Sequence, residues 1–221
     1  MMRWIAKAST PPRARATGTV YLLYFLTAIL AQFLVGRGLV VMGNVTNIIA
    51  VVFYSAVTLL FYGMFKPVNR VLSLLGALFS LVGCAVMTLS FFHLPAWNAS
   101  PLMFFGPYCL VIGFLIFRST FLPRILGVLM ALAGLGWLAV LTPAPAHPLT
   151  VGIQVLGILA EGSLMLWLVI MGVDDARWRE QAGQEQRRQL STQRSQWRRS
   201  KGPLATSTTQ FDPFAASDET E

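Results

Sequence analysis

Six long runs of apolar residues dominate the sequence between residues 19 and 173, and short polar turns separate them. A helix needs about 20 mostly apolar residues to cross a bilayer, because each residue rises about 1.5 Å. The second, third and sixth runs reach this length, and we expect the other three to extend by a few flanking residues. The pattern therefore predicts an all-α membrane protein built as a bundle of six transmembrane helices. The runs are Thr19–Val35, Thr46–Phe65, Val71–Leu94, Leu102–Phe117, Ile125–Leu141 and Leu149–Val173.

The positions of the basic residues predict how these helices are oriented. Of the 17 lysines and arginines, all but Arg37 lie before the first run, in the turns at 66–70 and 118–124, or after the sixth run. With six spans these four regions share one side of the membrane, and one span more or fewer would break the alternation. Because cytoplasmic loops carry an excess of Lys and Arg, we expect both termini in the cytoplasm. The net charge of +8 is then a signal of topology, and we do not expect nucleic-acid binding.

Composition supports a membrane protein and offers little for catalysis. Charged residues make up 12% of the chain, against about 25% in soluble domains. Cys84 and Cys109 both lie inside apolar runs, so no disulfide framework is implied. His93 and His147 are far apart in sequence, and no Cys and His residues have metal-ligand spacing. We therefore predict no metal, no cofactor and no enzymatic activity.

The rest of the chain divides around the six-span domain at 18–173. Residues 1–17 form a basic leader, which we expect in the cytoplasm. Residues 174–201 are rich in Arg and Gln and favour a helix weakly, which predicts a basic juxtamembrane helix. Residues 202–221 are rich in Ser and Thr and then acidic, with no apolar pattern, so we expect disorder there.

Two interpretations of residues 174–201 remain open. The first is a helix that lies on the inner leaflet, because Trp178, Ala182, Leu190 and Trp197 would share one side of it. The second is a solvated extension of the sixth span. In the first case basic side chains beside the membrane would contact anionic lipid. These are Arg177, Arg179, Arg187 and Arg188.

Glu161 is the one carboxylate among the apolar runs and marks the candidate site. It lies in the middle of the sixth run, so about 18 Å of helix separates it from either end. A charge at that depth costs at least about 2.5–3.5 kcal/mol, so the group must be protonated, paired or exposed to water. No Lys or Arg lies inside any run, so its partners would be neutral residues of the polar stripes that we expect to face one another. We take Gln154, Ser80, Tyr54 and Thr58 as members of this site, with Ser55 and Tyr24 as alternatives.

Several short strings form a recognisable pattern: Phe65-Lys66-Pro67-Val68-Asn69-Arg70, Phe104-Phe105-Gly106 with Cys109 and Gly113, Arg118-Ser119 with Leu122-Pro123-Arg124, and Ala160-Glu161-Gly162 through Trp167-Leu168 to Gly172-Val173. Together they resemble a bacterial membrane family, domain of unknown function 4386. The resemblance covers about residues 18–173 and implies a bacterial inner-membrane protein of about six helices. It implies an arginine in the third span where this chain has Ser80, so an ion pair with Glu161 would be lost here. It brings no established activity, substrate or cofactor.

Two functions follow as hypotheses. The first is a non-enzymatic membrane bundle whose partners are the lipid bilayer, including anionic lipid at the basic tail, or another copy or membrane protein. The second is a small proton-linked transporter that uses Glu161. A carboxyl group that only holds helices together by hydrogen bonds is the structural alternative to this second function.

Overall fold

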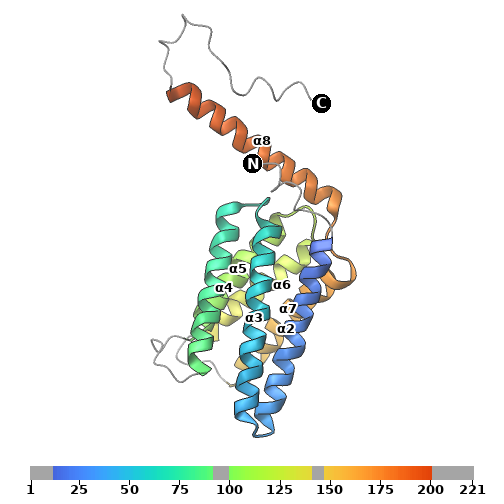
Figure 1. The fold of residues 1–221 in the computed structure, drawn as a ribbon, viewed down its shortest axis with the longest axis vertical. Helices are drawn as coiled ribbons and strands as arrows, with labels where there is room; N and C mark the ends of the chain where they lie inside the picture. The colour runs from blue at the N-terminus through green and yellow to red at the C-terminus, as the bar shows by residue number, and fades with distance from the viewer. Residues whose placement is uncertain (1–11, 92–99, 141–146, 201–221) are drawn as a thin grey trace, which may run out of the picture. The chain divides into compact units, whose positions relative to one another are not determined.

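The computed structural model describes residues 12–91, 100–140 and 147–200, and every regular element in these ranges is a helix (Figure 1). The chain splits into two compact units, Met1–Ala182 and Gly183–Glu221. Most of the predicted leader, the predicted disordered tail at 202–221 and His93 lie outside the described residues. The helices are α2 (Pro12–Gly36), α3 (Val40–Phe65), α4 (Arg70–Phe91), α5 (Leu102–Arg118), α6 (Arg124–Val140), α7 (His147–Ile170) and α8 (Asp175–Ser200).

Helices α2 to α7 form a closed ring. Each helix packs against the helices before and after it in the sequence, and α7 closes the ring by packing against α2 (Figure 1). Because the connections are short, helices that follow one another in the sequence run antiparallel. Buried apolar side chains from all six helices fill the interior.

Local sequence explains where two of these helices end or begin. Gly38 has a positive φ of 81°, and the N–H groups of Gly38 and Leu39 bond to the carbonyls of Val35 and Leu34 at 2.9 and 3.0 Å. This pattern of bonds ends a helix at a glycine, which adopts positive φ without strain. At the next turn the Asn69 side chain accepts a bond of 3.0 Å from the Leu72 N–H and so caps α4.

Helices α5 and α6 approach each other most closely through glycine. A Cβ added to Gly113 would lie 2.7 Å from the carbonyl oxygen of Gly127, and one added to Gly127 would lie 2.7 Å from that of Gly113. The pair Gly106 and Gly134 repeats this arrangement two turns away. The glycines of α5 and α6 are therefore the contact surface between the two backbones.

Four of the helices are long and apolar enough to cross a membrane: Ala14–Gly36, Val40–Phe65, Arg70–Phe91 and Thr150–Ile170. Helices α5 and α6 are apolar but have 17 residues each, about 25 Å of helix against a hydrocarbon core of about 30 Å. The expected extension of the fourth run does not occur, because α5 begins after Pro101 and ends before Ser119. The first helix does extend, but at its basic end, where α2 begins at Pro12.

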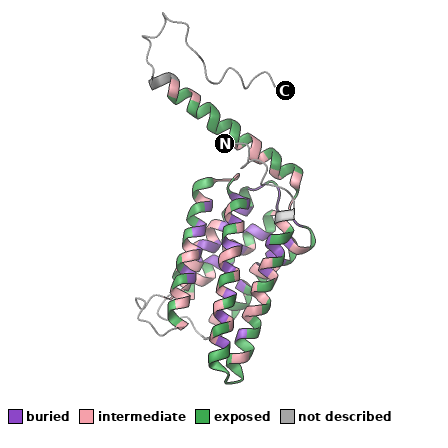
Figure 2. Ribbon diagram, in the orientation of Figure 1, coloured by how far each residue is buried: buried purple, intermediate pink, exposed green. Residues whose placement is uncertain are grey.

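The outer surface of the ring is apolar. Figure 2 shows exposed residues along the outside of the helices, and many of these are large hydrophobic side chains. Ile29, Val41 and Val71 are 64%, 78% and 67% exposed. A soluble protein rarely exposes so continuous an apolar surface, whereas a helix in lipid requires one. Together with the four long apolar helices, this surface indicates a membrane protein.

Candidate functional site

Glu161 lies in the middle of α7 and faces α2. The residue before it in the helix, Ala160, is fully buried, as is Leu164, whereas Glu161 itself is half-buried. The Tyr21 hydroxyl donates a hydrogen bond of 2.8 Å to Oε2 of Glu161. Among the residues that the structure describes, the other carboxyl oxygen, Oε1, has no hydrogen-bond partner. The carboxyl group is therefore held at one oxygen and open at the other.

A cluster of aromatic rings surrounds this carboxyl group. Tyr21 and Tyr24 come from α2, Tyr54 from α3 and Tyr108 from α5, so four of the five tyrosines in the chain gather here. The ring centroids of Tyr24 and Tyr54 are 4.7 Å apart, and those of Tyr54 and Tyr108 are 6.1 Å apart. Such separations are typical of favourable aromatic pairs. Phe25, Phe61 and Phe105 complete the cluster.

The carboxylate lies inside the ring of helices. It is close enough to interact electrostatically with the hydroxyls of Tyr24, Tyr54 and Tyr108 and with the Cys109 thiol. Since these groups belong to α2, α3 and α5, the carboxylate of α7 must point between these helices.

The Tyr108 hydroxyl is the unsatisfied polar group of this cluster. Its side chain is 1% exposed, and the hydroxyl lies close to that of Tyr54 but makes no hydrogen bond of normal geometry to any residue that the structure describes. A buried polar atom without a partner costs about 1–3 kcal/mol, so this hydroxyl is a point at which a bound group could gain a hydrogen bond.

The predicted members of the site separate into three places. Tyr54 belongs to the aromatic cluster around Glu161. Thr58 and Ser80 instead bond to each other across α3 and α4, with 2.6 Å between their hydroxyl oxygens. Because Thr58 donates its proton to the Tyr54 carbonyl at 3.0 Å, Ser80 is the donor in this pair. Gln154 is exposed on α7 and does not join the site.

Tyr21 is the partner of Glu161 that the sequence reasoning did not single out. It occurs in the polar stripe of the first run, at the position three residues before Tyr24. That spacing predicts that both tyrosines share one face of the helix. Its contact with Glu161 depends on the packing of α2 against α7. Neither apolar run contains a pattern that predicts this packing.

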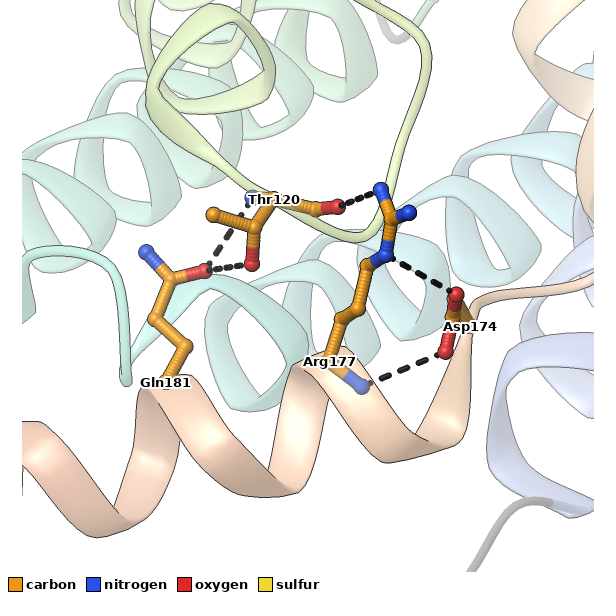
Figure 3. A network of polar contacts seen from close by, with 4 residues as sticks. All are labelled: Thr120, Asp174, Arg177 and Gln181. Atoms are coloured by element: carbon orange, nitrogen blue, oxygen red, sulfur yellow. Dashed lines mark hydrogen bonds and ion pairs between the residues drawn. The ribbon is translucent and has the colours of Figure 1, made fainter.

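A second polar cluster joins the start of α8 to the turn between α5 and α6 (Figure 3). Asp174 precedes α8, and its Oδ1 accepts a bond of 3.2 Å from the Arg177 N–H, so it caps the helix. The Arg177 guanidinium donates to the Thr120 carbonyl at 3.3 Å and pairs with Asp174 at 3.2 Å. The Gln181 side-chain oxygen accepts bonds from both the N–H and the hydroxyl of Thr120, at 3.2 and 3.1 Å.

Trp178 extends this contact to the end of α3. Its indole N–H donates a bond of 3.0 Å to the Met64 carbonyl, and its ring packs against the core. The first two turns of α8 therefore contact the ends of α3 and α5, next to Lys66 and Arg118. These contacts bring the basic turns at 66–70 and 118–124 and the start of the basic tail to one end of the ring.

The four arginines predicted to contact lipid differ in their surroundings. Arg177 is held by Thr120 and Asp174, as described above. Arg179, Arg187 and Arg188 are exposed, and the last two belong to the second unit. Within the described residues, no group of three or more His, Cys, Asp or Glu side chains could hold a metal ion.

Comparison with known proteins finds one family whose model matches part of this chain. Residues 93–172 match the family described as "Domain of unknown function (DUF4386)". The match confirms the predicted resemblance for residues 93–172, which include α5, α6 and α7 with Glu161. The matched DUF4386 region excludes Tyr21 and Tyr54, so it covers part of the aromatic cluster.

A relative in an archaeon has a similar sequence. This "Uncharacterized protein" of Archaeoglobus fulgidus is 27% identical over 118 residues, which cover 50% of this chain and 72% of the relative. No solved structure matches the chain.

Proposed function

We propose that this chain is a non-enzymatic multi-pass protein of the bacterial inner membrane, with six spans and both termini in the cytoplasm. Its ring of helices is the membrane domain, and its basic helix α8 binds anionic lipid at the inner surface. The observation that carries this proposal is the contact of Trp178 and Arg177 with the ends of α3 and α5. It puts the start of the basic helix beside the basic turns, where positively charged residues meet the anionic leaflet.

Lipid binding by α8 can be tested by removing two exposed arginines. Each basic residue near an anionic surface contributes about 1 kcal/mol, so R187Q/R188Q should weaken binding by about 2 kcal/mol, or about 30-fold. The measurement is a titration of fluorescent phosphatidylglycerol into the detergent-solubilised full chain. Added salt should weaken the wild-type affinity, because exposed charges are screened.

The matched control is Q189A, which alters a neighbouring exposed residue without changing the charge. If the double variant bound the anionic lipid as tightly as Q189A, the proposal that α8 binds anionic lipid would be wrong.

The arrangement around Glu161 supports a second candidate function, a small proton-linked transporter. A carboxyl group inside the ring, bonded at one oxygen and open at the other, can bind and release a proton. An ionisable group within a membrane domain is a functional-site hypothesis by default. E161Q should fold normally and lose proton-coupled flux in proteoliposomes. If E161Q instead changes stability alone, Glu161 serves only to hold α7 against α2.

A further inference from the structure

We propose that the Glu161 cluster is a binding site for a hydrophobic organic monocation, such as a substituted ammonium or phosphonium ion. This inference rests on the second candidate function above and names its substrate class. It starts from the charge of the site. When ionised, Glu161 supplies one negative charge, and no lysine or arginine lies inside the predicted apolar runs to balance it. A monovalent cation balances that charge at a depth where an unpaired carboxylate is costly.

The walls of the site select the kind of cation. The rings of Tyr21, Tyr24, Tyr54 and Tyr108 pack against one another beside the carboxyl group, and an aromatic face attracts a cation within about 6 Å of its centroid. Aromatic and apolar walls suit a cation that carries hydrocarbon substituents. Calcium and magnesium ions take six or more oxygen ligands, and the described residues provide no cluster of three or more metal-ligating side chains here.

The exposure of the site's side chains and the oxygens that lack hydrogen bonds indicate where the ligand would bind. Tyr21, Tyr54 and Tyr108 are buried, whereas Glu161 and Tyr24 keep intermediate exposure, so a ligand reaches these two first. Oε1 of Glu161 and the hydroxyl of Tyr108 both lack partners among the described residues. These two oxygens are the polar groups that a bound cation would satisfy.

Protons should compete with the cation, because both bind the same carboxyl group. The other titratable groups that face Glu161 are the tyrosine hydroxyls of α2, α3 and α5 and the Cys109 thiol. These groups are neutral when protonated, and α6 has no titratable residue beyond Arg124 at its start. Glu161 is therefore the group that must release its proton before the cation binds.

The experiment measures equilibrium binding of tetraphenylphosphonium to the detergent-solubilised full chain by isothermal titration calorimetry. Wild type should bind this cation saturably, and E161Q should bind it at least tenfold more weakly. Y24L should weaken it severalfold, whereas Y62L should leave it unchanged, because Tyr62 lies outside the aromatic cluster. Tetraphenylborate has the same shape and the opposite charge, and its binding should not depend on Glu161.

Two results would overturn the inference. One is equal affinity of wild type and E161Q for the cation, with both proteins monodisperse by size-exclusion chromatography. The other is equal binding of tetraphenylphosphonium by wild type and Y24L, which keeps Glu161 and tests the aromatic wall alone. Binding without flux in proteoliposomes would overturn the transport proposal and leave the cation site standing.

Discussion

At the scale of single residues, the hydrogen bond between Tyr21 and Glu161 joins α2 and α7, the first and last helices of the ring. The bond is 2.8 Å long and links residues 140 positions apart in the sequence. In a membrane interior such a bond has no competing water, yet measured interhelical bonds contribute only about 0.6 kcal/mol on average and about 1.7 kcal/mol at most. Its energetic role is therefore modest, and its importance is that it orients the carboxyl group.

Removal of the Tyr21 hydroxyl tests this contact. Y21F should lower the free energy of unfolding by about 1 kcal/mol, because the carboxyl loses its donor while the ring still packs. The measurement is unfolding in mixed micelles, with Y62F as the control from outside the cluster. In the E161L background, which has no acceptor, the same substitution should cost less, since the two residues act as a pair. Additive effects of Y21F and E161L would show that the bond does not form.

The Thr58–Ser80 pair is a second residue-scale contact. S80A leaves Thr58 without its cross-helix donor, and it should lower the free energy of unfolding by about 0.6–1 kcal/mol. The exposed Ser90, which bonds only within its own helix, provides the control variant S90A. Equal stability of S80A and S90A would contradict a role for this pair in joining α3 and α4.

At the scale of helices, α5 and α6 depend on glycine for their separation. Both are shorter than the other helices of the ring, and their backbones touch where Gly113 faces Gly127 and Gly106 faces Gly134. Van der Waals contact between small residues drives helix association in lipid, where apolar burial gains nothing. This pair of helices is therefore the part of the ring most sensitive to added volume.

Substitution of one of these glycines should separate the helices. In G113A the new methyl group would lie 2.7 Å from the Gly127 carbonyl oxygen, which is backbone and cannot rotate away. We expect a loss of about 1–3 kcal/mol in unfolding free energy, the range for overpacked interiors. G63A, a helical position with nothing within 4 Å, should be neutral or stabilising. A G113A protein as stable as G63A would contradict close packing of α5 on α6.

The start of α8 is the second element-scale contact. W178F removes the indole donor to the Met64 carbonyl but keeps an aromatic ring. The loss of about 1 kcal/mol should increase hydrogen exchange of residues 175–182 about fivefold, as these turns open more often. R179Q, a change at an exposed neighbour, should leave the exchange unchanged.

At the scale of the whole molecule, the ring has one basic end. The turn at 66–70, the turn at 118–124 and the start of α8 meet there, and Arg37 lies in the turn at the opposite end of α2. Positively charged residues resist translocation, so the basic end should face the cytoplasm.

Cysteine labelling in intact cells tests this orientation. A cysteine at position 37 should react with an impermeant maleimide from outside. Cysteines at 69 and 120 should react only after the membrane is permeabilised. The buried native cysteines, Cys84 and Cys109, provide a low background. A reporter fused after residue 173 that proves active in the periplasm would reverse the proposed topology.

The sequence by itself determined the class of the protein, the positions of its apolar helices and the family resemblance that comparison confirmed for residues 93–172. The preference of a residue for lipid or for water depends on its own hydropathy and charge. It can therefore be deduced from the sequence without knowledge of the packing between helices. The end of α3 at Phe65, the bounds of α5 to within one residue, and the polar stripes at Tyr54, Thr58 and Ser80 were predictable for this reason, whereas α3 begins six residues before the predicted run.

Only the tertiary structure decided which of these polar residues meet. Closure of the ring puts Gly18 of α2 so close to α7 that a Cβ there would lie 2.6 Å from the Val169 nitrogen. This approach puts Tyr21 against Glu161 and leaves Gln154 exposed, although Gln154 lies only seven residues before Glu161. Partners of this kind depend on contacts between segments far apart in the chain, and periodicity within one segment carries no information about them.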